Sequence, residues 1–212
     1  MTKITHILFD LSEVYLRGMH GMEDDVAGLL EVPHDEFIDQ ISTDTLTLLF
    51  RGEISEDEYW DRVIEENGYP PVLDGSSTRE VFKTAIRKNA LEIEGTGDII
   101  RSLKQNYSLG LVSDHAREWV EYLLRRYPLD ELFDALCFSY EIGRSKRDQD
   151  PEIYKQALDK LGADPEKTLY VDDKPDNIEI ATSPEVGIAY GHVFADAPSF
   201  RRALEQEYQI TV

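Results

Sequence analysis

Near its start the chain reads Ile4-Thr5-His6-Ile7-Leu8-Phe9-Asp10-Leu11-Ser12-Glu13-Val14. A short apolar run with several β-branched and aromatic residues predicts a buried strand over residues 4–10. Asp10 stands at the carboxyl end of this strand. Open α/β sheets bind their ligands outside the carboxyl ends of their strands, so the position of Asp10 indicates a functional site.

The second half of the chain alternates between strand-like runs and helix-like segments. We expect strands over residues 108–113, 135–138, 168–172 and 187–190, with amphipathic helices between them. Repeated strand–helix units predict an α/β fold with a doubly wound parallel sheet. The strands over 108–113 and 168–172 end in Ser113 and in Asp172-Asp173, so polar groups follow three strand ends.

Residues 15–90 have a different pattern, because their apolar residues recur at helical spacing and no strand pattern interrupts them. Tyr59, Trp60 and Val63 are an example, and Ser55 with Glu58 fits a capping box before that helix. We therefore expect an all-helical cap over residues 15–90, inserted into an α/β core made of residues 1–14 and 91–212.

The composition limits the classes of partner. The formal net charge is -21, and so acidic a surface repels nucleic acid and anionic lipid, so we expect neither nucleic acid nor membrane as a partner. No apolar stretch approaches the roughly 20 residues of a membrane span, and no secretory signal is visible. Cys137 is the only cysteine, which excludes an intrachain disulfide and favours the cytoplasm. A homodimer is compatible with the sequence, which does not decide the oligomeric state.

The carboxylates at the strand ends permit two kinds of chemistry. Asp10 can act as a nucleophile on phosphorus or activated carbon, or as a hard oxygen ligand of Mg²⁺. Asp172 and Asp173 supply further oxygen ligands, and carboxylates held close together favour a cation between them. The alternative is that Asp10 only caps the turn that follows it, a common place for aspartate.

Ser113 and a basic loop could hold an anion. Ser113 precedes a helix, so its hydroxyl and the backbone N–H groups there can bind a phosphoryl group, or the serine can simply be an N-cap. Lys146 could neutralise a phosphoryl group and a nucleophilic carboxylate. Arg144 and Arg147 in the same loop could take its place.

Four short segments now resemble, in order and spacing, the motifs of the haloacid dehalogenase-like (HAD) hydrolase superfamily. They are Phe9-Asp10-Leu11-Ser12-Glu13-Val14, Val112-Ser113, Lys146 and Val171-Asp172-Asp173. Residues 50–60 resemble the helical cap of the subgroup whose first motif reads F-D-L-G-G-V. The resemblance covers nearly the whole chain.

The resemblance implies a role for each matching residue. Asp10 would be the nucleophile and a Mg²⁺ ligand, with the Ser12 carbonyl and Asp173 as further ligands and Asp172 beside them. Ser113 and Lys146 would hold the transferring phosphoryl group, and Asp114 next to Ser113 is a further candidate for substrate binding. The implied activity is Mg²⁺-dependent hydrolysis of a small phosphorylated metabolite through an aspartyl-phosphate.

Three departures from the family pattern keep other readings open. Ser12 stands where phosphatases of this superfamily usually have an acid/base aspartate. Asp114 stands where relatives often have Asn. The segment from Lys146 to Pro151 is longer than the usual Lys-Pro-Asp-Pro, so an alignment from its far side selects Asp148 instead of Lys146. The alternatives are a metal-independent dehalogenase acting on a carbon–halogen bond, and a catalytically degenerate HAD fold that only binds.

Overall fold

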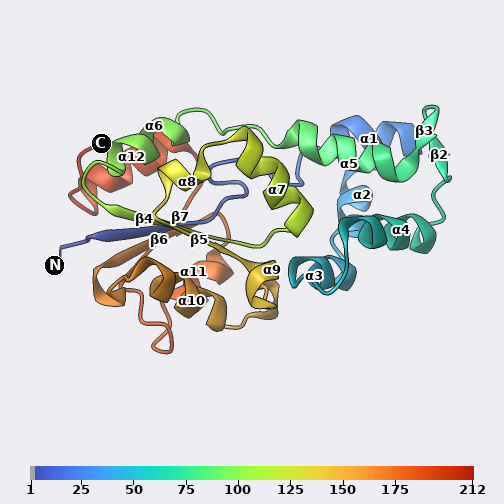
Figure 1. Cartoon of the computed structure of the whole chain (residues 1–212). Coiled ribbons are helices and arrows are strands. Elements are labelled where there is room, and N and C mark those ends of the chain that lie inside the picture. Colours follow the sequence, from blue (N-terminus) through green and yellow to red (C-terminus); the bar gives the residue numbers. More distant parts are fainter. Residues whose placement is uncertain (1–2) are drawn as a thin grey trace.

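The computed structural model describes residues 3–212, and at its centre lies a parallel sheet in the order β5-β4-β1-β6-β7 (Figure 1). Its strands are β1 (His6–Phe9), β4 (Ser108–Ser113), β5 (Ala135–Phe138), β6 (Thr168–Asp172) and β7 (Tyr190–Val193). Phe9 at the end of β1 lies opposite Leu111 on one side and Val171 on the other. The carboxyl ends of the three central strands therefore lie next to one another. The predicted doubly wound parallel sheet is confirmed.

Helices cover both faces of this sheet (Figure 1). One face carries α6 (Thr96–Leu103), α7 (Arg117–Arg126), α8 (Leu129–Leu132) and α12 (Ala197–Gln206). The other carries α9 (Ser139–Ile142), the 3₁₀ helix η1 (Lys146–Asp148), α10 (Glu152–Leu161), the 3₁₀ helix η2 (Pro165–Lys167) and α11 (Pro175–Ala181). Side chains alternate along β1, so Ile7 and Phe9 pack on the first face and Leu8 on the second. Within residues 3–212 no helix combines the length and apolarity needed to cross a membrane.

The last strand lies three residues later than the sequence pattern predicts. Residues 187–189 do not join the ladder, because Ile188 N donates to Ala181 O and Ala189 N donates to Pro165 O. Gly187 has a φ of +80°, which turns the chain away from α11 before pairing begins at Tyr190. The expectation of a strand over 187–190 is therefore corrected to β7.

Residues 15–90, called the helical block below, lie beyond the carboxyl ends of the strands (Figure 1). They form α1 (Glu23–Leu30), α2 (His34–Ile41), α3 (Asp44–Phe50), α4 (Glu56–Glu66) and α5 (Thr78–Asn89) around an apolar cluster. A small hairpin of β2 (Val72–Leu73) and β3 (Ser76–Ser77) was not expected. Its strands are too short for an alternating pattern, and it depends on Asp74-Gly75, both at positive φ as a primed turn requires.

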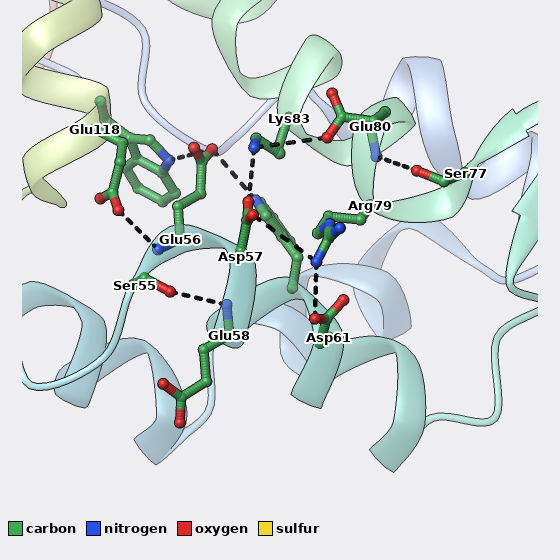
Figure 2. Close-up of polar contacts among 12 residues, drawn as sticks. Ser55, Glu56, Asp57, Glu58, Asp61, Ser77, Arg79, Glu80, Lys83 and Glu118 are labelled. Atoms are coloured by element: carbon green, nitrogen blue, oxygen red, sulfur yellow. Dashed lines mark hydrogen bonds and ion pairs between the residues drawn. The ribbon is translucent and has the colours of Figure 1, made fainter.

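A buried carboxylate joins the helical block to the core. Glu56 on α4 is 1% exposed, and its side chain accepts hydrogen bonds from Trp119 Nε1 on α7 at 2.8 Å and from both Nη atoms of Arg87 on α5 at 2.9 and 2.6 Å. Figure 2 shows Glu118 of α7 meeting the start of α4, where its Oε1 accepts from Glu56 N at 3.3 Å. The paired charge and these donors compensate the cost of burying the carboxylate.

We expect Glu56→Gln to destabilise the chain. The substitution removes the charge that faces Arg87 and weakens hydrogen bonds to charged groups, so the free energy of unfolding should fall by about 2 kcal/mol. Glu58→Gln is the matched control, because Glu58 is exposed and its ion pair in the described part of the chain is with Arg62, one turn along α4. The control should cost less than about 1 kcal/mol in the same urea titrations. Equal losses in both variants would contradict the role of Glu56.

Candidate active site

A cavity of about 530 Å³ lies between the strand ends and the helical block. Six residues singled out in the sequence line it: Asp10, Ser12, Ser113, Asp114, Lys146 and Asp173. Asp172, the remaining one, is fully buried at the end of β6. The structure thus brings all seven residues to one region of the fold.

The Lys146 ammonium lies at the centre of this region. Its Nζ is 2.8 Å from Asp10 Oδ1 and 2.9 Å from Asp172 Oδ2, and Lys146 is only 5% exposed. Burial acts to lower the pKa of Lys146, but Asp10 and Asp172 outweigh it and hold that pKa well above its usual value. Lys146 therefore stays charged beside the strand ends.

Asp172 is held by a complete set of hydrogen bonds. Its carboxylate accepts from Asn177 Nδ2 at 2.9 and 3.0 Å, from Lys174 N at 2.8 Å, and from the Tyr170 hydroxyl. Burial acts to raise the pKa of Asp172, yet Lys146 and Tyr170 hold it below its usual value. Tyr170 was not predicted as a site residue, although it precedes Asp172 by two in one strand and so shares its face.

The carboxylate of Asp10 has fewer partners. Its Oδ1 forms the ion pair with Lys146 but accepts no well-aligned hydrogen bond. Burial raises the pKa of Asp10 to about 7 against the lowering effect of Lys146, with Asp172 adding to the rise. The pKa of Asp173 is also raised, by burial and by Asp172. With all three ionised, Asp10, Asp172 and Asp173 would carry more negative charge than Lys146 alone can balance.

A divalent cation fits this arrangement. Asp10, Asp172 and Asp173 each place one oxygen so that all three atoms lie within 4.8 Å of one another. Carboxylate and carbonyl oxygens are the ligands that Mg²⁺ and Ca²⁺ prefer. A bound cation would give the under-bonded oxygen of Asp10 a partner and would lower the raised pKa of Asp10. Ser12 lines the same cavity.

Ser113 contacts a histidine that sequence reasoning did not select. Its Oγ lies 3.1 Å from His115 Nδ1, and the His115 backbone N–H donates to Ser139 Oγ. Burial lowers the pKa of His115 to about 4, so its ring is neutral near pH 7. A single histidine without metal-ligand spacing gives no signal in a sequence, so this contact was missed.

The three cations of the loop take separate positions. Arg144 is exposed and pairs with Asp150 at 3.5 Å, whereas Arg147 reaches across to the helical block. Lys146 is the one beside Asp10. Asp148, the other residue selected by alignment, turns away to pair with Arg51.

Asp114 and Glu13 are both occupied by local contacts. The two oxygens of Asp114 accept from Ser145 Oγ at 2.6 Å and from Lys146 N at 3.0 Å. Glu13 Oε1 accepts from Gly18 N at 2.8 Å, within the turn that leads into the helical block. Asp114 thus holds the loop that carries Lys146, and Glu13 holds the turn after β1.

The side of the cavity opposite the strand ends comes from the helical block. It combines apolar and polar side chains: Met19, His20, Ser42, Asp44, Leu46, Thr47 and Phe50. The sequence predicted a helical cap over residues 15–90, but within it helix-packing and ligand-contacting residues look alike. Only the folded chain separates them.

Solved structures share this fold. One is a HAD family enzyme of Bacteroides thetaiotaomicron, with a TM-score of 0.76, 18% identity, and coverage of 95% of this chain and 98% of that one. The wild-type enzyme in complex with magnesium and inorganic phosphate has a TM-score of 0.71 and 20% identity, over 91% and 95% of the two chains. Likenesses at this identity show the fold.

Two relatives are similar in sequence over shorter stretches. Pyrophosphatase PpaX of Bacillus cereus is 36% identical over 88 residues, which are 41% of this chain and 40% of the relative. A phosphorylated carbohydrates phosphatase of Thermotoga maritima is 30% identical over 115 residues, or 54% and 51%. The chain spans about half the length of these relatives or less. The family model described as haloacid dehalogenase-like hydrolase matches residues 35–190, and the chain belongs to this family.

Proposed function

We propose that the chain is a Mg²⁺-dependent phosphatase that hydrolyses a small phosphorylated metabolite through Asp10. The observation that carries the proposal is the Lys146 ammonium, 2.8 Å from Asp10 Oδ1, in a cavity also lined by Ser113. A carboxylate nucleophile, a fixed cation and a hydroxyl at one point are the groups that transfer of a phosphoryl group needs. The names of the two relatives, a pyrophosphatase and a phosphatase of phosphorylated carbohydrates, support this substrate class.

In the first step the Asp10 carboxylate attacks phosphorus. A bond forms between a carboxylate oxygen and phosphorus, and the bond from phosphorus to the ester oxygen breaks. The leaving oxygen takes a proton from water and departs as an alcohol, and the hydroxide left behind takes up the proton that the attacking water of the second step releases. Lys146 and Ser113 hold the phosphoryl oxygens while their charge shifts, and the fixed position of Lys146 between Asp10 and Asp172 requires no rearrangement.

In the second step water attacks the phosphorus of the aspartyl-phosphate, which releases inorganic phosphate and restores Asp10. Asp10, Asp173 and the Ser12 carbonyl would hold Mg²⁺, which when bound offsets the negative charge of the substrate and the carboxylates. The helical block would act as a cap, with residues 15–90 excluding bulk water and selecting the leaving group.

The second candidate function is binding without catalysis by a degenerate HAD fold, and Ser12 favours it. No carboxylate stands at that position to pass a proton to the leaving group, and Glu13 is engaged with Gly18 N. In that case the cavity would bind a phosphorylated molecule without turning it over. Phosphate release separates the two candidates.

Asp10→Asn should abolish turnover. The amide is a far weaker nucleophile than the carboxylate, so we expect kcat to fall more than about a thousandfold. The measurement is phosphate release from a panel of phosphorylated metabolites with Mg²⁺ present. Asp130→Asn, an exposed aspartate on α8, is the control and should keep the native rate. Equal release by the native chain and Asp10→Asn would refute the nucleophile assignment, and no release by either would favour the binding reading.

Mg²⁺ should stabilise the native chain against heat. A cation at a hundredfold excess over its Kd adds about 2.7 kcal/mol to the free energy of unfolding, which raises the Tm of a chain of this size by several degrees. Asp173→Asn should lose this rise because it removes one of the oxygen ligands, whereas Asp130→Asn should keep it. An unchanged Tm of the native chain over a full Mg²⁺ titration would argue against the site.

Ser12→Asp should change the dependence on the leaving group. Without an acid at position 12, we expect the native chain to favour aryl phosphates over alkyl phosphates, because alkoxide leaving groups need a proton more. The variant should raise kcat/KM for an alkyl phosphate more than for an aryl phosphate. Ser12→Asn, similar in shape but unable to give up a proton, is the control. An equal change for both esters would show that position 12 does not move the proton.

A further inference from the structure

The loop that carries Lys146 has an unusual path. Asp150 Oδ1 accepts from Glu152 N at 2.9 Å and so caps the start of α10. Three residues, Arg147, Asp148 and Gln149, connect Lys146 to this cap. Lys146–Asp148 forms the turn η1, and Gln149 returns the chain at a φ of +54°. This longer loop places the side chains of Arg147 and Asp148 next to the helical block.

Both side chains make contacts across the boundary. Arg51, which follows α3, binds Asp148 with two nitrogens, with Nε donating to Oδ2 at 2.8 Å and Nη2 to Oδ1. In the opposite direction Arg147 donates from Nε to Thr47 Oγ1 at 3.0 Å and from Nη2 to Ser42 O at 2.7 Å. Each side of the boundary therefore contributes one arginine. A two-point guanidinium–carboxylate contact fixes orientation as well as distance.

The contact between Arg51 and Asp148 continues to the backbone of Ser145, the residue before Lys146. Asp148 Oδ2, which accepts from Arg51, also accepts from Ser145 N at 3.0 Å. On the core side Asp114 accepts from Ser145 Oγ at 2.6 Å and from Lys146 N at 3.0 Å. Lys146 is thus held between Asp114 from the core and Arg51 from the helical block.

The end of α3 also fits closely against the core. Gly52 follows Arg51 at a φ of +71°, and a Cβ there would lie 3.1 Å from the Tyr140 carbonyl oxygen on α9. A side chain at this position would be strained by the backbone conformation and crowded by that carbonyl. The turn that positions Arg51 beside Asp148 therefore packs directly against the core.

We propose that Arg51 is a positioning residue for Lys146, acting through Asp148 to couple the seating of the helical block to the placement of the Lys146 ammonium. When the end of α3 is seated, Asp148 is fixed and Lys146 reaches Asp10. When it leaves, the loop loses its outer support and the ammonium loses its fixed place. The consequence for phosphoryl binding rests on the phosphatase function proposed above, but the placement of Lys146 does not.

The test measures the accessibility of the Lys146 amine. Native chain, Arg51→Gln, Arg51→Lys and Arg79→Gln are treated briefly with an amine-acetylating reagent, and the peptide that contains Lys146 is quantified by mass spectrometry. We expect the rate of acetylation at Lys146 to rise about fivefold in Arg51→Gln, the size of effect that a partly exposed ion pair supports. Arg51→Lys keeps the positive charge but loses the two-point contact. Its rate of acetylation at Lys146 should therefore lie between those of the native chain and Arg51→Gln.

Arg79→Gln is the matched control for the loss of an arginine. Arg79 pairs with Asp61 at 2.8 Å inside the helical block, far along the chain from the loop, and is 34% exposed against 30% for Arg51. Its loss should leave acetylation at Lys146 at the native rate. Asp148→Asn should raise the rate of acetylation at Lys146 as Arg51→Gln does. The double variant Arg51→Gln/Asp148→Asn should be acetylated no faster than the faster of the two single variants.

Activity gives a second readout. With a phosphate ester as substrate, Arg51→Gln should raise KM and the inhibition constant for inorganic phosphate about fivefold, the same order as the labelling. A native chain without turnover would contradict the proposed function, while the labelling would still test the positioning. Unchanged acetylation in Arg51→Gln, or additive effects in the double variant, would overturn the role of Arg51.

Discussion

The buried ammonium of Lys146 and the carboxylates of Asp10 and Asp172 depend on each other. A charge taken out of water costs several kcal/mol, and a buried pair persists only when its geometry and hydrogen bonds are good. Asp172 meets this condition with Asn177, Tyr170 and Lys146 around it, whereas among residues 3–212 the Asp10 carboxylate has Lys146 as its one charged partner. The poorly compensated carboxylate of Asp10 lies where a nucleophile and a cation ligand are expected. The feature that makes this carboxylate costly to bury is therefore also the one that would make it reactive.

The topology explains why these groups meet. β1, β4 and β6 are adjacent and parallel, so Asp10, Ser113 and Asp172 come to one edge although they are far apart in the sequence. Lys146 comes from a loop after β5, at the far side of the sheet, and must reach past β4 to Asp10. The chain carries a net charge of -21, so the phosphorylated substrate proposed above would meet local attraction where such cations are gathered.

The sequence predicted the strand ends because each is a local pattern, an apolar run followed by a polar residue. It predicted the helical block for the same reason, since helical spacing is read within one segment. Contacts between distant segments leave no such pattern. Glu56 reads as one acidic residue among several at a helix start, and only folding places Trp119 against it. Arg51 and Asp148 likewise lie 97 residues apart and show no periodicity that links them.

Two of the contacts between the helical block and the core, those of Glu56 and Arg51, differ in strength. Glu56 is 1% exposed, and its carboxylate accepts a hydrogen bond from Trp119 across the boundary, whereas its ion pair with Arg87 lies within the helical block. A hydrogen bond to a charged group contributes about 1.5–3 kcal/mol. Arg51 and Asp148 are 30% and 15% exposed, and a pair in contact with water is worth about 1 kcal/mol or less. The contact between Arg51 and Asp148 is therefore the weaker of the two. This weaker contact is also the one that adjoins Lys146, so the coupling proposed for Arg51 would act on the side of the boundary that resists separation least.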